Sequence, residues 1–119
     1  MFRIILYEDR SGKSPVLERI AELEAHHGKD SRIRLTKIRE YIKLLELHGT
    51  RLPETYVKHI DGEIWELRPI DDRIFFAGVI NETFVLLHSY IKKTQKTPQR
   101  EIEQAKRELK DYKERTGEA

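Results

Sequence analysis

The stretch that decides the fold runs from Ile64 to Lys92 and reads IWELRPIDDRIFFAGVINETFVLLHSYIK. Three runs within it are rich in β-branched and aromatic residues, as strands are: residues 64–70, 73–80 and 83–92. Asp71-Asp72 and Asn81-Glu82 separate these runs, and Asp and Asn tolerate the backbone angles of tight turns. The stretch therefore predicts three consecutive antiparallel strands joined by two short hairpins.

Two-residue loops in both hairpins would fix which side chains share a face of the sheet. Residue 68 then pairs with 75, residue 75 with 88, and residue 73 with 90. Because side chains alternate along a strand, one face collects the residues Arg68, Arg73, Phe75, His88, Tyr90 and Lys92. The other face is apolar and collects Trp65, Leu67, Ile74, Phe76, Ile80, Val85, Leu87 and Ile91. We expect helices to cover the apolar face, and Glu66 to lie on the cationic face, where it tempers the charge or supplies a base.

The flanking sequence predicts one strand and three helices around this sheet. Residues 2–8 are apolar and predict an opening strand. Helices are predicted from Ser14-Pro15 to Gly28, over residues 31–48 before Gly49, and after Thr97-Pro98. Residues 56–60 fit either a short strand or a loop. The order β-α-α-β-β-β-α predicts an α+β fold, with two N-terminal helices on one face of a mainly antiparallel, twisted sheet and a C-terminal helix.

Length and composition restrict the kind of protein. A chain of 119 residues suits one domain, which we place at residues 1–119. The absence of cysteine excludes a disulfide framework, a cysteine–zinc site and thiol catalysis. No stretch resembles a signal peptide or a membrane helix, so we expect a cytoplasmic protein without a membrane partner.

Charge is distributed unevenly along the chain, although the net charge is only +2. Residues 53–82 contain seven acids and three bases, whereas residues 83–100 contain four bases and no acid. The four bases are Lys92, Lys93, Lys96 and Arg100, which follow the last predicted strand. A phosphate-bearing ligand is the natural partner of such a segment.

The cationic face has the side chains that RNA cleavage requires. Arginine offers paired donors that match a phosphate, and Tyr90 and Phe75 offer flat faces for unpaired bases. The 2′-hydroxyl of RNA can attack its own phosphodiester when cations stabilise the phosphorane and side chains transfer protons. His88 has a near-neutral pKa in isolation, which suits proton transfer. The histidines elsewhere lack metal-ligand spacing, so we expect neither a metal nor a cofactor.

Four segments resemble the HigB-type branch of the RelE/ParE toxins, which belong to type II toxin–antitoxin systems and include phage-derived members. They are Trp65-Glu66-Leu67-Arg68-Pro69, Arg73-Ile74-Phe75-Phe76, residues 87–98 (LHSYIKKTQKTP) and Glu101-Ile102-x-x-Ala105. The predicted order of strands and helices also matches, so the resemblance spans most of the chain. It implies a RelE-like fold and a ribosome-dependent, metal-independent mRNA endonuclease, or mRNA interferase, that inhibits translation. It also implies neutralisation by a helix-turn-helix antitoxin in a hetero-oligomer, with the ribosome and mRNA as further partners.

The resemblance also assigns roles by position. Arg73 and Arg68 match basic residues of the central strands, and Lys92, Lys93 and Lys96 lie where relatives place further catalytic bases. Tyr90 stands where this branch often has Phe. Together with the cationic face and the basic segment, this gives Arg68, Arg73, Lys93, Tyr90 and His88 as catalytic candidates and Lys92, Lys96, Arg100 and Phe75 as RNA-binding candidates.

Other interpretations stay open at the level of sequence. The arginines could be exposed strand residues that pair with Glu66, Asp71 or Asp72, and the lysines could protect a sheet edge. His88 could be a hydrogen-bonded core residue. At the level of function, a ParE-like inhibitor of DNA gyrase without nuclease activity, or a non-catalytic RNA-binding module, would share the fold.

Overall fold

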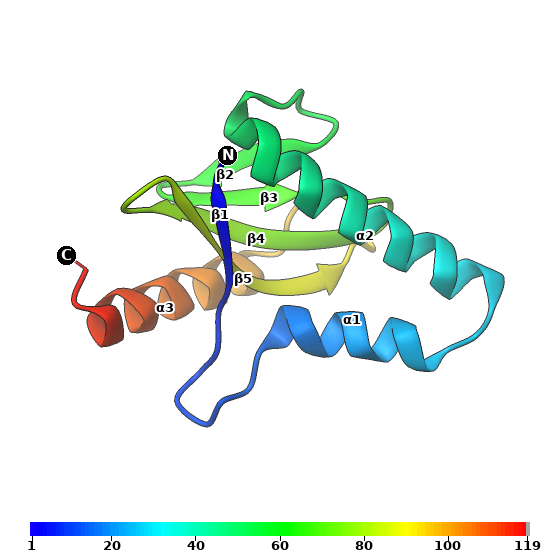
Figure 1. Ribbon diagram of the computed structural model, residues 1–119, viewed down its shortest axis with the longest axis horizontal. Helices are drawn as coiled ribbons and strands as arrows, with labels where there is room; N and C mark the ends of the chain where they lie inside the picture. The colour runs from blue at the N-terminus through cyan, green and yellow to red at the C-terminus, as the bar shows by residue number, and fades with distance from the viewer. Residues whose placement is uncertain (119) are drawn as a thin grey trace.

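The computed structural model describes residues 1–118 and contains one five-stranded sheet with three α-helices (Figure 1). The elements in chain order are β1 (Arg3–Leu6), α1 (Pro15–Ala25), α2 (Lys29–His48), the 3-10 turn η1 (Gly49–Arg51), β2 (Val57–Asp61), β3 (Ile64–Leu67), β4 (Asp72–Val79), β5 (Thr83–Ile91) and α3 (Gln99–Thr116). The predicted α+β fold is confirmed. The segment around residues 56–60 is a strand, β2, which pairs with β3.

The strands lie in the order β1-β5-β4-β3-β2. β1 pairs with β5 in parallel, and the other neighbours pair in antiparallel, so the sheet is mainly antiparallel, as predicted. α1 and α2 form a helical hairpin, which Figure 1 shows joined by a short loop. None of the helices in residues 1–118 is long and apolar enough to cross a membrane.

Two apolar clusters, one on each face, hold the helices to the sheet. Leu35, Ile38 and Leu45 of α2 pack with sheet residues Leu67, Ile74, Phe76 and Leu86. Ile102, Ala105 and Leu109 of α3 pack with Phe75, Ala77, Val85 and Leu87 on the opposite face. Both faces are therefore covered, and the face expected to be cationic is largely buried under α3.

The helix ends follow local chemistry. Pro15 occupies the first turn of α1 after the extended Ser14, as predicted. Gly49 ends α2 at a φ of +60°, and a Cβ there would lie 2.7 Å from the Phe2 ring, so only glycine fits. α3 differs slightly from the prediction, because Pro98 precedes the helix and Gln99 begins it.

The β4–β5 hairpin corrects the predicted faces. Its loop has three residues, 80–82, because Val79 pairs with Thr83, and Asn81 and Glu82 adopt φ values of +59° and +53°. A β-bulge near Phe75 restores the predicted Arg73–Tyr90 pair further along the ladder. The predicted β4–β5 pairing is therefore wrong for the residues between the 80–82 loop and the bulge.

Four residues expected on the covered apolar face lie elsewhere. Val85 and Leu87 point to α3, because the longer loop shifts β5 by one residue and so exchanges its faces. Ile80 lies in the loop with 62% of its surface exposed, and Ile91 at the end of β5 is also exposed.

The β3–β4 connection is longer than two residues but keeps the predicted faces. Leu67 pairs with Ile74, so residues 68–71 form the loop, and Ile70 within it has a φ of +54°. The register differs from the predicted one by two residues, and a two-residue shift leaves each side chain on its original face.

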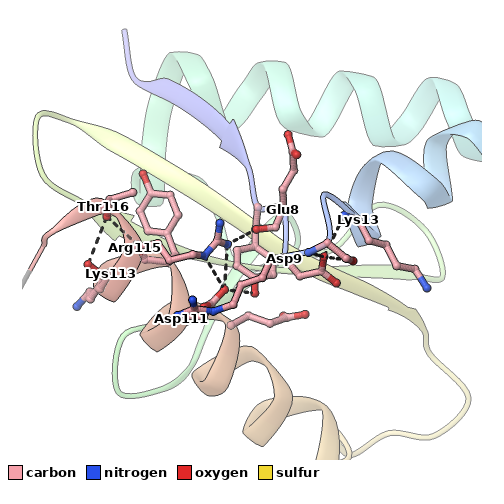
Figure 2. Close-up of polar contacts among 12 residues, drawn as sticks. Glu8, Asp9, Lys13, Asp111, Lys113, Arg115 and Thr116 are labelled. Atoms are coloured by element: carbon pink, nitrogen blue, oxygen red, sulfur yellow. Dashed lines mark hydrogen bonds and ion pairs between the residues drawn. The ribbon is translucent and has the colours of Figure 1, made fainter.

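A polar cluster fastens the end of β1 to α3. The Tyr7 hydroxyl donates to Asp111 at 2.7 Å, and Arg10 Nε donates to the same carboxylate at 3.1 Å. Figure 2 shows Asp111 and Arg115 of α3 facing the segment from Glu8 to Lys13, and Arg115 also donates to the Glu8 carbonyl. Arg115 Nη2 lies 2.9 Å from Asp111 Oδ2. This Asp111 cluster joins residues separated by about a hundred positions in the chain.

Candidate functional site

Four strands bring charged side chains together at one end of the sheet. Lys58 of β2 pairs with Glu66 of β3, Glu66 pairs with Phe75 of β4, and Arg73 pairs with Tyr90 of β5. Nine residues line a small pocket there: Lys58, Glu66, Arg68, Arg73, Tyr90, Lys92, Thr94, Gln95 and Thr97. We call it the sheet-end pocket. It unites four predicted site residues, namely Arg68, Arg73, Tyr90 and Lys92.

Glu66 is the one acid of this pocket and is almost fully buried, with 2% of its surface exposed. Its Oε2 accepts a hydrogen bond from the Tyr90 hydroxyl at 2.9 Å. Its Oε1 lies 3.6 Å from Arg68 Nε and 3.8 Å from Arg73 Nε, which are ion-pair distances but too long for good hydrogen bonds. Glu66 therefore lies between two arginines, and within residues 1–118 its side chain accepts a hydrogen bond from Tyr90 alone.

Arg73 is held by its own turn and is only 6% exposed. Its Nη1 donates to the carbonyls of Ile70 at 2.7 Å and Asp72 at 2.9 Å. No hydrogen bond engages its Nη2 within residues 1–118. The guanidinium is thus fixed on one side and has donors left for an anion on the other.

Arg68 follows the end of β3 and is held more loosely. Its Nη1 donates to the Glu54 carbonyl at 3.1 Å. Its Nε is buried without a hydrogen-bond partner and has only the longer contact to Glu66. An incoming acceptor would therefore improve the hydrogen bonding of this guanidinium.

Tyr90 rests on the buried ring of Phe75, with 5.4 Å between ring centroids. Burial, together with the charge and hydrogen bond of Glu66, raises the pKa of the Tyr90 hydroxyl to about 12, although Thr97 and Arg73 act in the opposite direction. The hydroxyl therefore carries its proton at neutral pH and donates it to Glu66.

The lysines after β5 divide between two neighbouring pockets. Lys92 lines the sheet-end pocket, whereas Lys93 and Arg100 line a second pocket between α1 and the start of α3. Tyr90 and Thr94 line both pockets. Lys96 is exposed on the same loop. Of the ion pairs within residues 1–118, none includes Lys92, Lys93, Lys96 or Arg100, so these cations keep their charge for a ligand.

Two predicted site residues lie in the interior. Phe75 is 0% exposed under Tyr90 and His88, so its ring face is not available to a nucleic-acid base. His88 is buried between β5 and α3, where Nδ1 lies 2.6 Å from Glu108 and Nε2 lies 3.1 Å from Glu101. The prediction treated this face as open, and α3 covers it instead.

The carboxylates around His88 raise its pKa. Burial alone would lower its pKa, but the hydrogen bonds and charges of Glu108 and Glu101 outweigh burial and raise the pKa. Both ring nitrogens are engaged by carboxylates, which is the arrangement of a charged imidazolium that links β5 to α3.

Sequence reasoning missed Lys58, Thr94, Gln95 and Thr97 of the sheet-end pocket. Lys58 had a usable signal, because assigning residues 56–60 to a strand paired with β3 places it opposite Glu66. Gln95 and Thr97 lie in a loop without hydrophobic periodicity, so no pattern indicated them. Within residues 1–118, no group of three or more His, Asp or Glu side chains is arranged to hold a metal ion.

Comparisons with known proteins identify the family. A comparison with curated proteins finds no significant match. The model of the family described as "Phage derived protein Gp49-like" matches residues 16–110, which include all four strands of the sheet-end pocket and most of α3. That match covers well over half of the chain, and the chain therefore belongs to the phage-derived Gp49-like family, a family of RelE/HigB-like toxins.

Proposed function

We propose that this protein is the toxin of a type II toxin–antitoxin system and cleaves mRNA on the ribosome. The observation that supports it most is the sheet-end pocket, where Arg68, Arg73 and Lys92 converge beside a buried carboxylate. The cations of the adjoining loop lack ion-pair partners within residues 1–118, and this suits a ligand with several phosphates. Membership of the Gp49-like family supports the toxin assignment and a helix-turn-helix antitoxin as partner.

Each basic residue has a role in the proposed reaction that fits its position. Arg73 Nη2 and Arg68 would hold the non-bridging oxygens of one phosphodiester, since both side chains line the sheet-end pocket beside Glu66. Their charges would stabilise the phosphorane formed when the 2′-hydroxyl attacks. Lys92 would protonate the departing 5′-oxygen. Lys93, Lys96 and Arg100 would bind the neighbouring phosphates.

The shape of the site supports a role for the ribosome. Tyr90 is the one aromatic side chain that lines the sheet-end pocket, and Phe75 below it is buried. Recognition of unpaired RNA depends largely on stacking of bases against exposed aromatic rings, and the sheet-end pocket has one such ring. Positioning of the mRNA would then come from the ribosome, while the protein supplies the charges that act on one phosphate.

Mapping of transcript ends after induction tests the proposal. Wild-type protein should produce cuts within translated messages, and Arg73→Ala should remove both the cuts and the growth arrest. Arg115→Ala is a matched control, because it removes an arginine of the Asp111 cluster rather than of the pocket. Urea denaturation of each variant would show that it still folds.

Two results would contradict the proposal. Intact transcripts together with blocked DNA supercoiling would favour a gyrase inhibitor of the same fold. Cleavage by Arg73→Ala at the wild-type rate would remove the sheet-end pocket from the reaction.

A further inference from the structure

The sheet-end pocket contains a carboxylate with unused hydrogen-bonding capacity. Among the described residues 1–118, Glu66 accepts one side-chain hydrogen bond, from Tyr90, and its other oxygen has only the long contacts to Arg68 and Arg73. Glu108, which is also buried, accepts hydrogen bonds from His88 at 2.6 Å and Gln104 at 3.2 Å. Asp72 Oδ1 accepts from Arg19 Nε at 2.8 Å, and its Oδ2 is buried without a partner within residues 1–118, but Asp72 does not line the sheet-end pocket. Glu66 is the buried carboxylate that lines the pocket with the cations proposed to bind phosphate.

We propose that Glu66 is the proton acceptor of the cleavage reaction and receives the proton of the attacking 2′-hydroxyl through the Tyr90 hydroxyl. This inference rests on the proposed RNA-cleaving function. It assigns a catalytic residue to a step for which the basic residues of the pocket are unsuited, because arginine stays protonated and lysine is charged at neutral pH.

The geometry favours a relay over direct contact. Glu66 is 2% exposed, whereas Tyr90 is partly exposed and lines the pocket. The Tyr90 hydroxyl donates its proton to Glu66 at 2.9 Å, so the lone pairs of the phenol oxygen can accept a hydrogen bond from a ligand. A 2′-hydroxyl placed there would be connected to Glu66 by two consecutive hydrogen bonds.

Charged and titratable groups face Glu66 from every strand around it: Lys58 of β2, Arg68 after β3, Arg73 of β4, Tyr90 of β5 and Lys92 after β5. The proposed proton acceptor therefore lies among the cations that are proposed to hold the phosphodiester.

The step balances in atoms and charge. The 2′-oxygen forms a bond to phosphorus while its proton passes to the Tyr90 oxygen and the Tyr90 proton passes to Glu66. The bond from phosphorus to the 5′-oxygen breaks, and that oxygen takes a proton from Lys92. The products are a 2′,3′-cyclic phosphate and a 5′-hydroxyl. Exchange with water then removes the proton from Glu66 and returns one to Lys92.

A synthetic mRNA with sulfur in place of the bridging 5′-oxygen at a mapped cut site separates the base from the acid. Sulfur leaves without protonation, so this substrate should restore cleavage by Lys92→Met but not by Glu66→Gln. On the ordinary mRNA, Glu66→Gln should lower the single-turnover rate by about 10²–10⁴-fold, the usual contribution of a proton-transfer group.

Tyr90→Phe supplies a second, milder variant that keeps the ring packed on Phe75. It should lose a similar factor, and the double variant should lose little more than either single one, because the two residues act as a unit. Asp111→Asn should cleave at the wild-type rate, since that carboxylate also accepts from a tyrosine but lies outside the pocket.

The outcomes distinguish the two proposals. Wild-type protein that cuts neither substrate on programmed ribosomes would overturn the proposed function. Wild-type cleavage together with an unchanged rate for Glu66→Gln or Tyr90→Phe would overturn the role of Glu66 alone. Rescue of Glu66→Gln by the sulfur substrate would also overturn it, because Glu66 would then act on the leaving group.

Discussion

The protein contains two tyrosine–carboxylate pairs, each flanked by two arginines, and they differ in how the carboxylate is used. Asp111 accepts four hydrogen bonds, one from Tyr7, one from Arg10 and two from Arg115, at distances of 2.7–3.1 Å. Glu66 accepts one, from Tyr90, while its arginines stand 3.6 and 3.8 Å away. A tyrosine, a carboxylate and two arginines therefore form a hydrogen-bond-saturated cluster in one place and an unsaturated one in the other.

The electrostatic consequences differ in the same way. Hydrogen bonds from Tyr7 and Arg115 lower the pKa of Asp111, which is thereby fixed as an anion. Burial and the partner carboxylate raise the pKa of Tyr7 to about 12, as they do for Tyr90. The contrast teaches that the type of residue does not separate a structural cluster from a site. What separates them is whether donors and charges are left for a ligand.

The largest effect is expected at the ring beneath Tyr90. Phe75→Ala should lower the free energy of unfolding by about 3–5 kcal/mol, the usual cost of removing a buried phenylalanine. Urea denaturation measures this directly. Phe75→Leu, which keeps most of the volume, should retain RNA cleavage; loss of cleavage by a stably folded Phe75→Leu protein would return Phe75 to the RNA-binding residues.

The arginines of the two clusters should respond differently to a conservative change. Arg73→Lys should lower the cleavage rate by about 10²–10³-fold, because lysine cannot keep the two carbonyl bonds of the turn and also present a donor to phosphate. Arg115→Lys should leave cleavage unchanged. Single-turnover cleavage on programmed ribosomes compares them, and equal rates for the two variants would break the distinction between the clusters.

His88 should make stability depend on pH. Its pKa is raised in the folded state by Glu108 and Glu101, so its contribution is complete below about pH 6.5, the ordinary histidine pKa. The contribution should be lost as the pH rises through the higher folded-state value. Unfolding titrations from pH 6 to pH 9 should show stability falling for wild type and a flatter profile for His88→Gln. Identical profiles would mean that His88 is not a charged link to α3.

The smallest effect is expected for the saturated cluster. Tyr7→Phe removes one hydrogen bond to Asp111 and should cost about 0.5–1 kcal/mol of stability, since Asp111 keeps its arginines. RNA cleavage should not change. Thermal unfolding and cleavage assays on the same preparation test both parts, and a marked loss of cleavage would show that this cluster also serves the reaction.

Sequence reasoning captured the fold because long periodic segments dominate it. The strands β3, β4 and β5 and the helix stripe of Ile102, Ala105 and Leu109 were visible as patterns. The Arg73–Tyr90 pair was predicted correctly, although the bulge and the three-residue loop that produce it were not. The loop shifts the register by one residue and the bulge shifts it back, so the prediction is right at that pair and wrong for the β5 residues between loop and bulge.

The site was predictable only in part, because its members come from tertiary packing as well as from strands. Alternation placed Arg68, Arg73, Tyr90 and Lys92 together, and the structure groups them in one pocket. Nothing local indicated that α3 buries Phe75 and clamps His88 between two of its acids. Lys58 lies on β2, a strand of five residues, whose sequence pattern is too short to assign the strand or its partner.

The chemical nature of the ends of cut mRNA tests the central claim most directly. Programmed ribosomes treated with wild-type protein should yield fragments with a 2′,3′-cyclic phosphate on one side and a 5′-hydroxyl on the other, because the sheet-end pocket is proposed to promote attack by the 2′-hydroxyl. Fragments that end in 5′-phosphate, or mRNA that stays intact, would contradict the account.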